Sequence, residues 1–398
     1  MQAASVKCQA DKGALPPGVM TVFSFAGAIL IAASSSAVTP LYRLYQQSMH
    51  LTPFMITVVF AVYVVSLLTA LLTVGGLSDY VGRKPVILAA LLLNAAAMLL
   101  FAHAGDVGQL ILARAVQGLS VGTGITALGA AILDTDRRRG PLLNSVTVFL
   151  GMTAGALGTA AALTFASDPL HLVYDVLLGV TVLMAALLFA LPESAARKPG
   201  ALASLRPRLG VPSQSRPVLL RLTPANIATW ALGGFYLSLM PTVVASTMGV
   251  VSPWVGGLVV ATLMLSSAIA VAGFREWPAR LLVVLGPVAL SVGVAVSLAG
   301  IAQHLVALLL AGTVIAGFGF GAIFSGTMRA LLPTAHPDQR AGLLSAFYLQ
   351  SYLAFSLPAV AAGLAVPRIG LSTTAYAYGA VIILLAVVSM LAWLWSRR

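Results

Sequence analysis

Long stretches of this chain carry no charged side chain. Runs without Asp, Glu, Lys or Arg include residues 13–42, 44–78, 115–133, 141–167, 222–274, 281–328, 341–367 and 369–396. A membrane-spanning helix needs about 20 mostly apolar residues, so the two longest runs have room for two helices each. The pattern predicts twelve spans, at residues 19–42, 54–75, 86–104, 107–132, 142–166, 171–191, 225–248, 254–273, 281–301, 304–331, 341–365 and 372–395. The runs are continuously apolar, whereas barrel strands alternate over about ten residues.

Composition supports an integral membrane protein. Hydrophobic residues make up 60% of the 398 positions and charged residues only 8%, against about 25% charged in a typical soluble chain. The start of the chain lacks the apolar core and cleavage site of a signal peptide, so we expect the first helix to act as the insertion signal.

The positive charges predict the orientation of the spans. With the N-terminus in the cytoplasm, 19 Lys and Arg residues fall on the cytoplasmic side and two, Arg43 and Arg368, on the other. Cytoplasmic loops of membrane proteins carry this excess. We therefore expect a multi-pass protein of the cell inner (cytoplasmic) membrane with both termini in the cytoplasm. The bias also accounts for the net charge of +12 without a nucleic-acid partner.

The two halves of the chain resemble each other at an offset of about 200 residues. "LTPFMITVVFAVYVV" at 51–65 resembles "VSPWVGGLVVATLML" at 251–265, and "VQGLSVG" at 116–122 resembles "IAGFGFG" at 315–321. Repeats of this kind are typical of secondary transporters with a binding site between the halves. We predict an all-α membrane fold of twelve helices in two pseudo-symmetric six-helix bundles. The expected boundaries are 1–191 for the N-terminal bundle, 192–222 for a cytoplasmic linker and 223–398 for the C-terminal bundle.

The segment "GGLSDYVGRKP" at 75–85 gathers charge between two apolar runs. It resembles the G-x-L-x-D-x-x-G-R-K/R motif of the major facilitator superfamily, and the matching residues are Gly76, Leu77, Asp79, Gly82, Arg83 and Lys84. The resemblance extends over essentially the whole chain and implies transport by alternating access. It also implies that Asp79 pairs with a motif arginine and faces the N-terminus of the eleventh helix near Gly342, as part of a gate. In the alternative interpretation, this loop only sets the topology.

A second segment, "RAVQGLSVGTG" at 114–124, is similar to the family motif R-x-x-Q-G. The likeness implies a role for Arg114 and Gln117 in proton coupling or substrate contact. Alternatively, Arg114 snorkels to the nearby surface. Asp175 is an acid placed within a span, so it could pair with Arg114 or could be an exposed residue at a helix start. The first helix contains no acid, so the energy source stays open between protons and passive transport.

Small residues mark two predicted helix contacts. "GMTAGALG" at 151–158 resembles the antiporter motif of the family, although Ala156 stands where proline is usual, which weakens the case for antiport. Small residues let membrane helices approach closely. We therefore assign helix packing to Gly118, Gly122, Gly151, Gly155 and Gly158. "LPES" at 191–194 resembles the Pro-Glu that often ends the sixth helix in the family.

The resemblance also suggests which residues line a central cavity. The candidates on the first, seventh and eleventh helices are Ser35, Thr39, Trp230, Tyr236, Met240, Tyr348 and Gln350. Some of them could simply pack in the core. The C-terminal spans hold no charge away from their ends, which favours a neutral or amphipathic, moderately apolar substrate over one that needs fixed countercharges.

These features predict proton-coupled export of small amphipathic molecules by a monomer in the bilayer. An importer or facilitator of a neutral nutrient such as a sugar stays open, as does a membrane sensor or scaffold that has lost transport. An enzyme is not expected, because the chain has neither a G-x-x-x-x-G-K-S/T phosphate loop nor an H-E-x-x-H zinc motif. We expect no cofactor and no metal.

Overall fold

The computed structural model describes residues 17–207, 209–250, 252–337 and 339–395, and within these ranges the regular elements are helices. Both chain termini, whose side of the membrane was predicted above, lie outside the described residues. The first half contains α1 (Pro17–Met49), α2 (Pro53–Val74), α3 (Ser78–Val81), α4 (Arg83–Ala102), α5 (Val107–Thr135), α6 (Gly140–Phe165) and α7 (Pro169–Phe189). After α8 (Ala201–Ser204), the second half contains α9 (Arg216–Ser238), α10 (Met240–Thr247), α11 (Pro253–Gly273), α12 (Ala279–Ala302), α13 (Val306–Leu331), η1 (Leu332–Thr334), α14 (Arg340–Ile369) and α15 (Leu371–Trp395).

Twelve membrane spans account for these helices. Eleven of the described helices are each long and apolar enough to cross a bilayer, and α9 with α10 forms a twelfth span bent by 58°. The protein is therefore an all-α integral membrane protein, as predicted. The predicted spans match the helices to within a few residues, except that α1 continues to Met49 and α9 begins at Arg216. The last part of the predicted linker thus forms the first turns of α9.

The seventh span was predicted as one segment at 225–248, whereas the structure breaks it at Leu239. Pro241 causes the break, because proline has no N–H to donate and its ring clashes with the carbonyl four residues earlier. That carbonyl belongs to Leu237. It accepts a hydrogen bond from Thr39 Oγ1 of α1 instead, at 3.0 Å.

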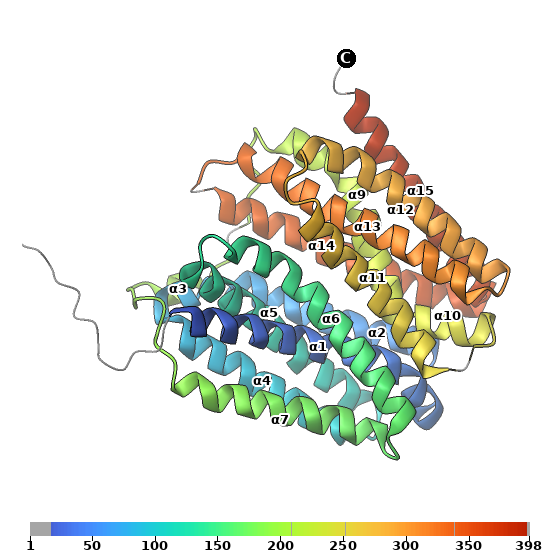
Figure 1. Ribbon diagram of the computed structural model, residues 1–398, viewed down its shortest axis with the longest axis horizontal. Coiled ribbons are helices and arrows are strands. Elements are labelled where there is room, and N and C mark those ends of the chain that lie inside the picture. The colour runs from blue at the N-terminus through green and yellow to red at the C-terminus, as the bar shows by residue number, and fades with distance from the viewer. Residues whose placement is uncertain (1–16, 208, 251, 338, 396–398) are drawn as a thin grey trace, which may run out of the picture.

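The two halves pack with the same pattern. α1 lies against α6 as α9 lies against α14, α4 against α5 as α12 against α13, and α4 against α7 as α12 against α15. In Figure 1 the helices of the first half, coloured blue to green, lie below those of the second half, coloured yellow to red. We call the contact surface between them the seam. It is formed chiefly by α2 against α14 and by α6 against α11.

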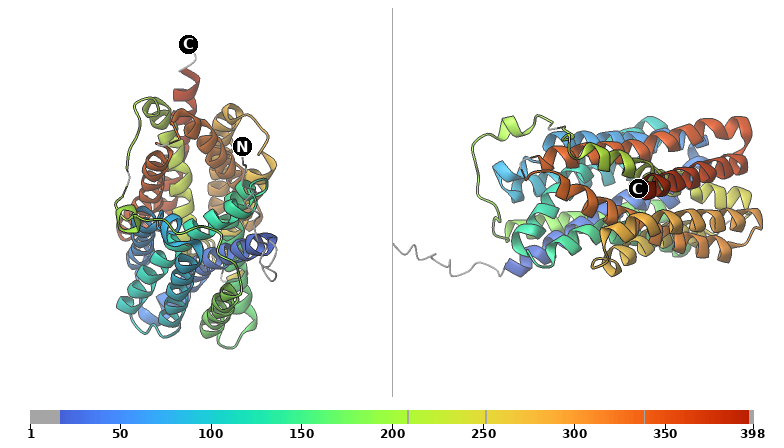
Figure 2. Two further views of the ribbon diagram at one scale, coloured as in Figure 1. Left: turned by 90° about the vertical axis from the view of Figure 1, so that its left-hand side faces the viewer. Right: turned by 90° about the horizontal axis from the view of Figure 1, so that it is seen from above.

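The segment between the halves runs across one end of the bundle (Figure 2). Lys198 N donates to Tyr80 O at 2.8 Å, which ties this linker to α3, and Gly210 N donates to Gly342 O at 3.4 Å, which ties it to α14. Residues 75–85 lie at the same end, which we call the motif end. The other end of the bundle, where α1 stops and α2 begins, is the opposite end.

Candidate gating and transport site

Arg83 is the centre of a charged cluster at the motif end. Its side chain is 8% exposed. Nη1 donates to Asp79 Oδ1 at 2.5 Å and to Ser78 Oγ at 2.7 Å, and Nε donates to Asp134 Oδ2 at 2.8 Å. Asp134 lies near the end of α5, so this one guanidinium fastens the loop after α2 to another helix of the same half. Its delocalised, forked donors suit it to hold two carboxylates at once.

Glu193 binds the same loop from the end of the first half. Its Oε1 accepts from Arg83 N at 2.7 Å and its Oε2 from Lys84 N at 3.1 Å. A carboxylate at these positions caps the N-terminus of α4, where free N–H groups and the helix dipole favour negative charge. Gly82 turns the chain with φ of 98°, and a Cβ on it would overlap the Glu193 carboxylate. Lys84 Nζ completes the contact by donating to Leu191 O at 2.5 Å. The sequence signal for Glu193 was the Pro-Glu likeness alone.

The expected contact of Asp79 with Gly342 is absent. The structure places the linker residue Gly210 against Gly342, and the Asp79 side chain is 56% exposed. Asp79 bonds to the motif arginine, as the resemblance implied, whereas the atoms nearest to Gly342 belong to the linker.

Arg114 is fully enclosed in the first half, at 1% exposure. Nη2 donates to Tyr42 Oη at 2.6 Å, and Nη1 donates to Gln117 Oε1 at 2.6 Å and Ser35 O at 3.1 Å. The guanidinium carbon also lies 5.2 Å from the ring centre of Tyr63, within the range of a cation–π contact. The side chain therefore does not snorkel.

Gln117 contributes a further bond to the same part of α1. Its Nε2 donates to Ser34 O at 2.9 Å. Arg114 and Gln117 together therefore form hydrogen bonds with residues 34–42. Among the described residues, no carboxylate forms an ion pair with Arg114.

The possible pairing of Asp175 with Arg114 is not realised. Asp175 is exposed on the outer face of α7, on the same face as Leu172 and Val176. Its neighbour Tyr174 points inward instead, with its hydroxyl 2.8 Å from that of Tyr45. One position along a helix rotates a side chain by about 100°, and the sequence could not fix which neighbour faces inward.

Four of the five predicted packing glycines lie against neighbouring backbone. A Cβ on Gly118 or Gly122 of α5 would overlap α2, and a Cβ on Gly151 or Gly155 of α6 would overlap α1. The prediction is wrong for Gly158, which has nothing within 4 Å of an added Cβ. The second half repeats the packing of α5 against α2. Gly317 and Gly321 of α13 meet α11 as Gly118 and Gly122 meet α2, which gives the sequence repeat a packing reason.

The predicted cavity residues lie in several parts of the structure. Thr39 and Trp230 lie at the seam. Ser35 is buried in the first half and donates to Ala32 O. Tyr236 and Met240 line a small void of about 20 Å³ inside the second half, so the structure does not bring them into a shared central cavity. Gln350 Nε2 donates to Thr223 Oγ1 at 2.8 Å, which joins α14 to α9. The Tyr348 ring packs on those of Phe347 and Tyr352 within α14.

Aromatic rings fill the middle of the seam. Trp230 lies 5.1 Å from Tyr352 and 5.7 Å from Phe355, between ring centres. Among the pairs that cross between the halves are Phe60 with Phe355 at 5.0 Å and Phe149 with Phe320 at 5.7 Å. The indole N–H of Trp230 is buried without a hydrogen-bond partner. The sequence did not predict a role for Phe60, Phe149, Phe320 and Phe355, because phenylalanine in a span carries no signal that separates seam from core.

Several contacts hold the seam together toward the opposite end. Besides the bond from Thr39 to Leu237, Thr242 Oγ1 donates to Gln46 Oε1 at 3.4 Å. A Cβ on Gly363 of α14 would overlap Thr57 of α2, and one on Gly257 of α11 would overlap Ala156 and Ala160 of α6. Ala156, which stands where the family motif usually has proline, takes part in this contact through its backbone carbonyl.

Comparison with known proteins places this arrangement in a family. A sequence model of the Major Facilitator Superfamily matches residues 24–275. The multidrug resistance protein MdtL of Escherichia coli O6:H1 is 32% identical over 216 residues, covering 48% of this chain and 54% of that protein. MdtL of Citrobacter koseri is 34% identical over 113 residues, covering 27% and 29% respectively. The chain thus spans about half the length, or less, of the curated relatives it matches.

A solved structure extends the likeness to the whole fold. The crystal structure of a mutant of the nucleoside transporter NupG superposes with a TM-score of 0.73 at 12% sequence identity, covering 94% of this chain and 99% of that one. At this identity the likeness concerns the fold alone. The family model matches well over half of the chain, in the segment that contains the Arg83 cluster and the buried Arg114. This chain therefore belongs to the Major Facilitator Superfamily.

Proposed function

We propose that the protein exports small amphipathic or moderately apolar molecules by alternating access, driven by protons. The observation that carries this proposal is the seam. Its middle is lined by aromatic rings, and within the described spans no carboxylate lies among them. Apolar, aromatic surfaces with a few polar groups suit molecules of this class. The unpaired N–H of Trp230 would donate to a carbonyl or ether oxygen of the substrate. The MdtL relatives, which are named multidrug resistance proteins, agree with drug export.

In this proposal, residues 1–191 and 223–398 rock as two bodies joined by the linker. The seam contacts from Thr39, Thr57 and Gly257 close the opposite end in the state described here. Arg114 and Gln117 act by holding residues 34–42 of α1 in position, because Thr39 lies within that stretch. The conformational change then requires these contacts to break together.

The cluster of Asp79, Arg83 and Asp134 is the proposed gate. Both carboxylates are partly exposed at the motif end, with Asp79 at 56% and Asp134 at 33%. Arg83 holds each of them by a charge-assisted bond, so the loss of these bonds would release the loop after α2 from α5. For a protein of the cell inner membrane, the positive-inside rule places the motif end in the cytoplasm.

The alternative is an importer or facilitator of a neutral nutrient. The observation that favours it is the lack of an acidic side chain in the middle of the described spans, because proton-coupled carriers use such groups. The likeness in fold to a nucleoside transporter is compatible with it but shows no substrate.

The deciding experiment is growth of efflux-deficient bacteria that express the protein, measured against a panel of amphipathic drugs. We expect resistance that is lost in Asp79→Asn and when the proton gradient is collapsed. Glu276→Gln is the matched control, because Glu276 is an exposed acid whose ion pair with Arg275 lies outside the cluster. Unchanged drug sensitivity with the protein present in the membrane would refute export. Uptake assays with neutral sugars and nucleosides would then test the alternative.

A further inference from the structure

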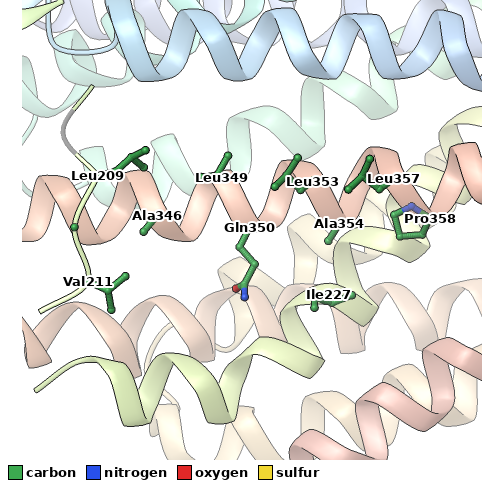
Figure 3. A pocket seen from close by; sticks show the side chains of 11 residues that line it. Leu209, Val211, Ile227, Ala346, Leu349, Gln350, Leu353, Ala354, Leu357 and Pro358 are labelled. Atoms are coloured by element: carbon green, nitrogen blue, oxygen red, sulfur yellow. The ribbon is translucent and has the colours of Figure 1, made fainter. Parts of the chain in front are cut away.

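A long apolar groove runs along α14, beside the aromatic part of the seam. It encloses about 660 Å³ and is lined by Leu349, Leu353 and Leu357 of α14, Ile227 of α9, and Leu209 and Val211 of the linker. In Figure 3 the three leucines of α14 project to one side of the helix, toward α2, and Ile227 lies on the other side. A groove of this size falls within the range of ordinary ligand pockets.

The exposure pattern of α14 marks an accessible apolar face along the groove. Leu353 is 39% exposed, Leu357 60% and Leu364 45%. Their spacing of four and seven residues puts them on one face of the helix. An exposed apolar face of this kind on a membrane-spanning helix suits contact with the acyl chains of lipids.

The motif end of the groove is polar and positively charged. The linker forms its rim, held there by the bond from Gly210 N to Gly342 O. Arg216 lies at this rim and donates from Nε to Val211 O at 3.3 Å, and Arg340 at the start of α14 donates from Nε to Ala335 O at 3.4 Å. Both arginines are exposed, and neither joins an ion pair within the described parts of the chain. Within the described residues, their hydrogen bonds to protein acceptors come from Nε alone.

We propose that the groove binds an anionic phospholipid, with an acyl chain over Leu353, Leu357 and Ile227 and the headgroup phosphate between Arg216 and Arg340. The apolar lining suits a hydrocarbon chain, and the two guanidinium groups suit a phosphate, which arginine binds through paired hydrogen bonds. Basic pockets beside membrane helices are known to select anionic headgroups. Bound lipid would also contact Leu209 and Val211, so it would hold the linker against α14.

The test measures lipid retention by the delipidated, full-length protein in native mass spectrometry. The probes are phosphatidylglycerol, phosphatidylcholine with the same acyl chains, and glycerol phosphate as a soluble headgroup. We expect the wild-type protein to retain phosphatidylglycerol in preference to phosphatidylcholine. The double variant Arg216→Gln with Arg340→Gln should lose about tenfold in affinity for phosphatidylglycerol alone, because charge-assisted bonds are lost. Ala346→Trp, which fills the groove next to Leu349, should weaken binding of both lipids.

Arg275→Gln is the matched control for charge, because Arg275 is an exposed arginine paired with Glu276 away from the groove. Gel filtration and the helical circular dichroism signal verify that each variant is folded. Equal retention of the two lipids by the wild type would overturn the headgroup assignment. Binding that survives both the double variant and Ala346→Trp would place the lipid elsewhere. Displacement by glycerol phosphate alone would show a soluble anion site, and displacement by a transported drug would show a substrate site.

Discussion

Thr39 of α1 donates a hydrogen bond across the seam to the backbone carbonyl of Leu237, 198 residues away. Pro241 leaves that carbonyl without a helical donor. The proline that bends the seventh span therefore also creates the acceptor that fastens it to the other half. The contact lies where the halves must separate if the opposite end opens. The break in the seventh span therefore contributes directly to a contact that the proposed transport cycle has to break.

Thr39→Val is expected to weaken closure of the opposite end. The substitution keeps the shape of the side chain but leaves the Leu237 carbonyl buried without a donor, at a cost of about 1–3 kcal/mol. We expect a lower melting temperature and faster maleimide labelling of a cysteine placed at Thr57, in a background in which the single cysteine, Cys8, is replaced by serine. The control is Thr69→Val, because Thr69 bonds only within its own helix, to Val65 O. Labelling that is equal in both variants would show that the bond does not hold the seam.

Asp134→Asn is expected to impair transport as strongly as Asp79→Asn. Arg83 is 8% exposed and uses separate nitrogens for the two carboxylates, so the loss of either partner leaves part of its charge uncompensated. Removing one partner of a buried charge is costly, and because Arg83 is the buried member of both pairs we expect a loss of at least about tenfold in transport. Transport should be measured in proteoliposomes with equal amounts of protein. Near-wild-type activity of Asp134→Asn would show that Asp134 is not part of the gate, and that Asp79 and Arg83 alone form it.

The two matching glycines of the charged loop should differ in their tolerance to alanine. Gly82 has a φ of 98°, and its Cβ would meet Glu193, whereas nothing lies within 4 Å of a Cβ on Gly76. Residues with a Cβ are strained in such conformations by about 1–2 kcal/mol. We expect Gly82→Ala to lower the thermal stability and Gly76→Ala to leave it nearly unchanged, as measured by thermal unfolding in detergent. Equal effects would show that the contact between Gly82 and Glu193 does not determine the tolerance.

A similar contrast is expected along α6. A Cβ on Gly155 would overlap Ala33 O and Ser36 Oγ of α1, and one on Gly158 would be free. Gly155→Ala should force α1 and α6 apart and reduce both expression and stability. Gly158→Ala should be neutral or slightly stabilising, because alanine favours helix by about 1 kcal/mol over glycine. Fluorescence-detected gel filtration of the two variants gives the comparison. A stable Gly155→Ala protein would contradict the close approach of these helices.

Arg114→Lys is expected to abolish transport although the charge is kept. Lysine presents its donors from one nitrogen and cannot reach Tyr42, Gln117 and Ser35 with the geometry of the planar guanidinium. Residues 34–42 of α1 would lose their anchor. Asp175→Asn should leave transport unchanged, because Asp175 is exposed on α7. Drug accumulation assays on both variants test the pair. Loss of transport in Asp175→Asn would restore a coupling role for that acid.

The sequence by itself determined the number of spans, their order and the family of the protein. Each of these follows from short-range properties. Charge-free runs of span length admit only helices in a bilayer, because backbone groups must bond within the segment. The motif at residues 75–85 specifies its own turn and the pairing of Asp79 with Arg83, which lie four residues apart.

The tertiary structure decided which side chains meet. The packing of α5 against α1 and α2 encloses Arg114 among aromatic rings rather than beside Asp175. The spans contain many phenylalanines, and only the packing of the two halves places Phe60, Phe149, Phe320 and Phe355 at the seam. The physical reason is that hydrophobic periodicity marks a buried face only when the other face is in water. In a bilayer both faces are apolar, so only the neighbouring helices distinguish lipid, core and seam.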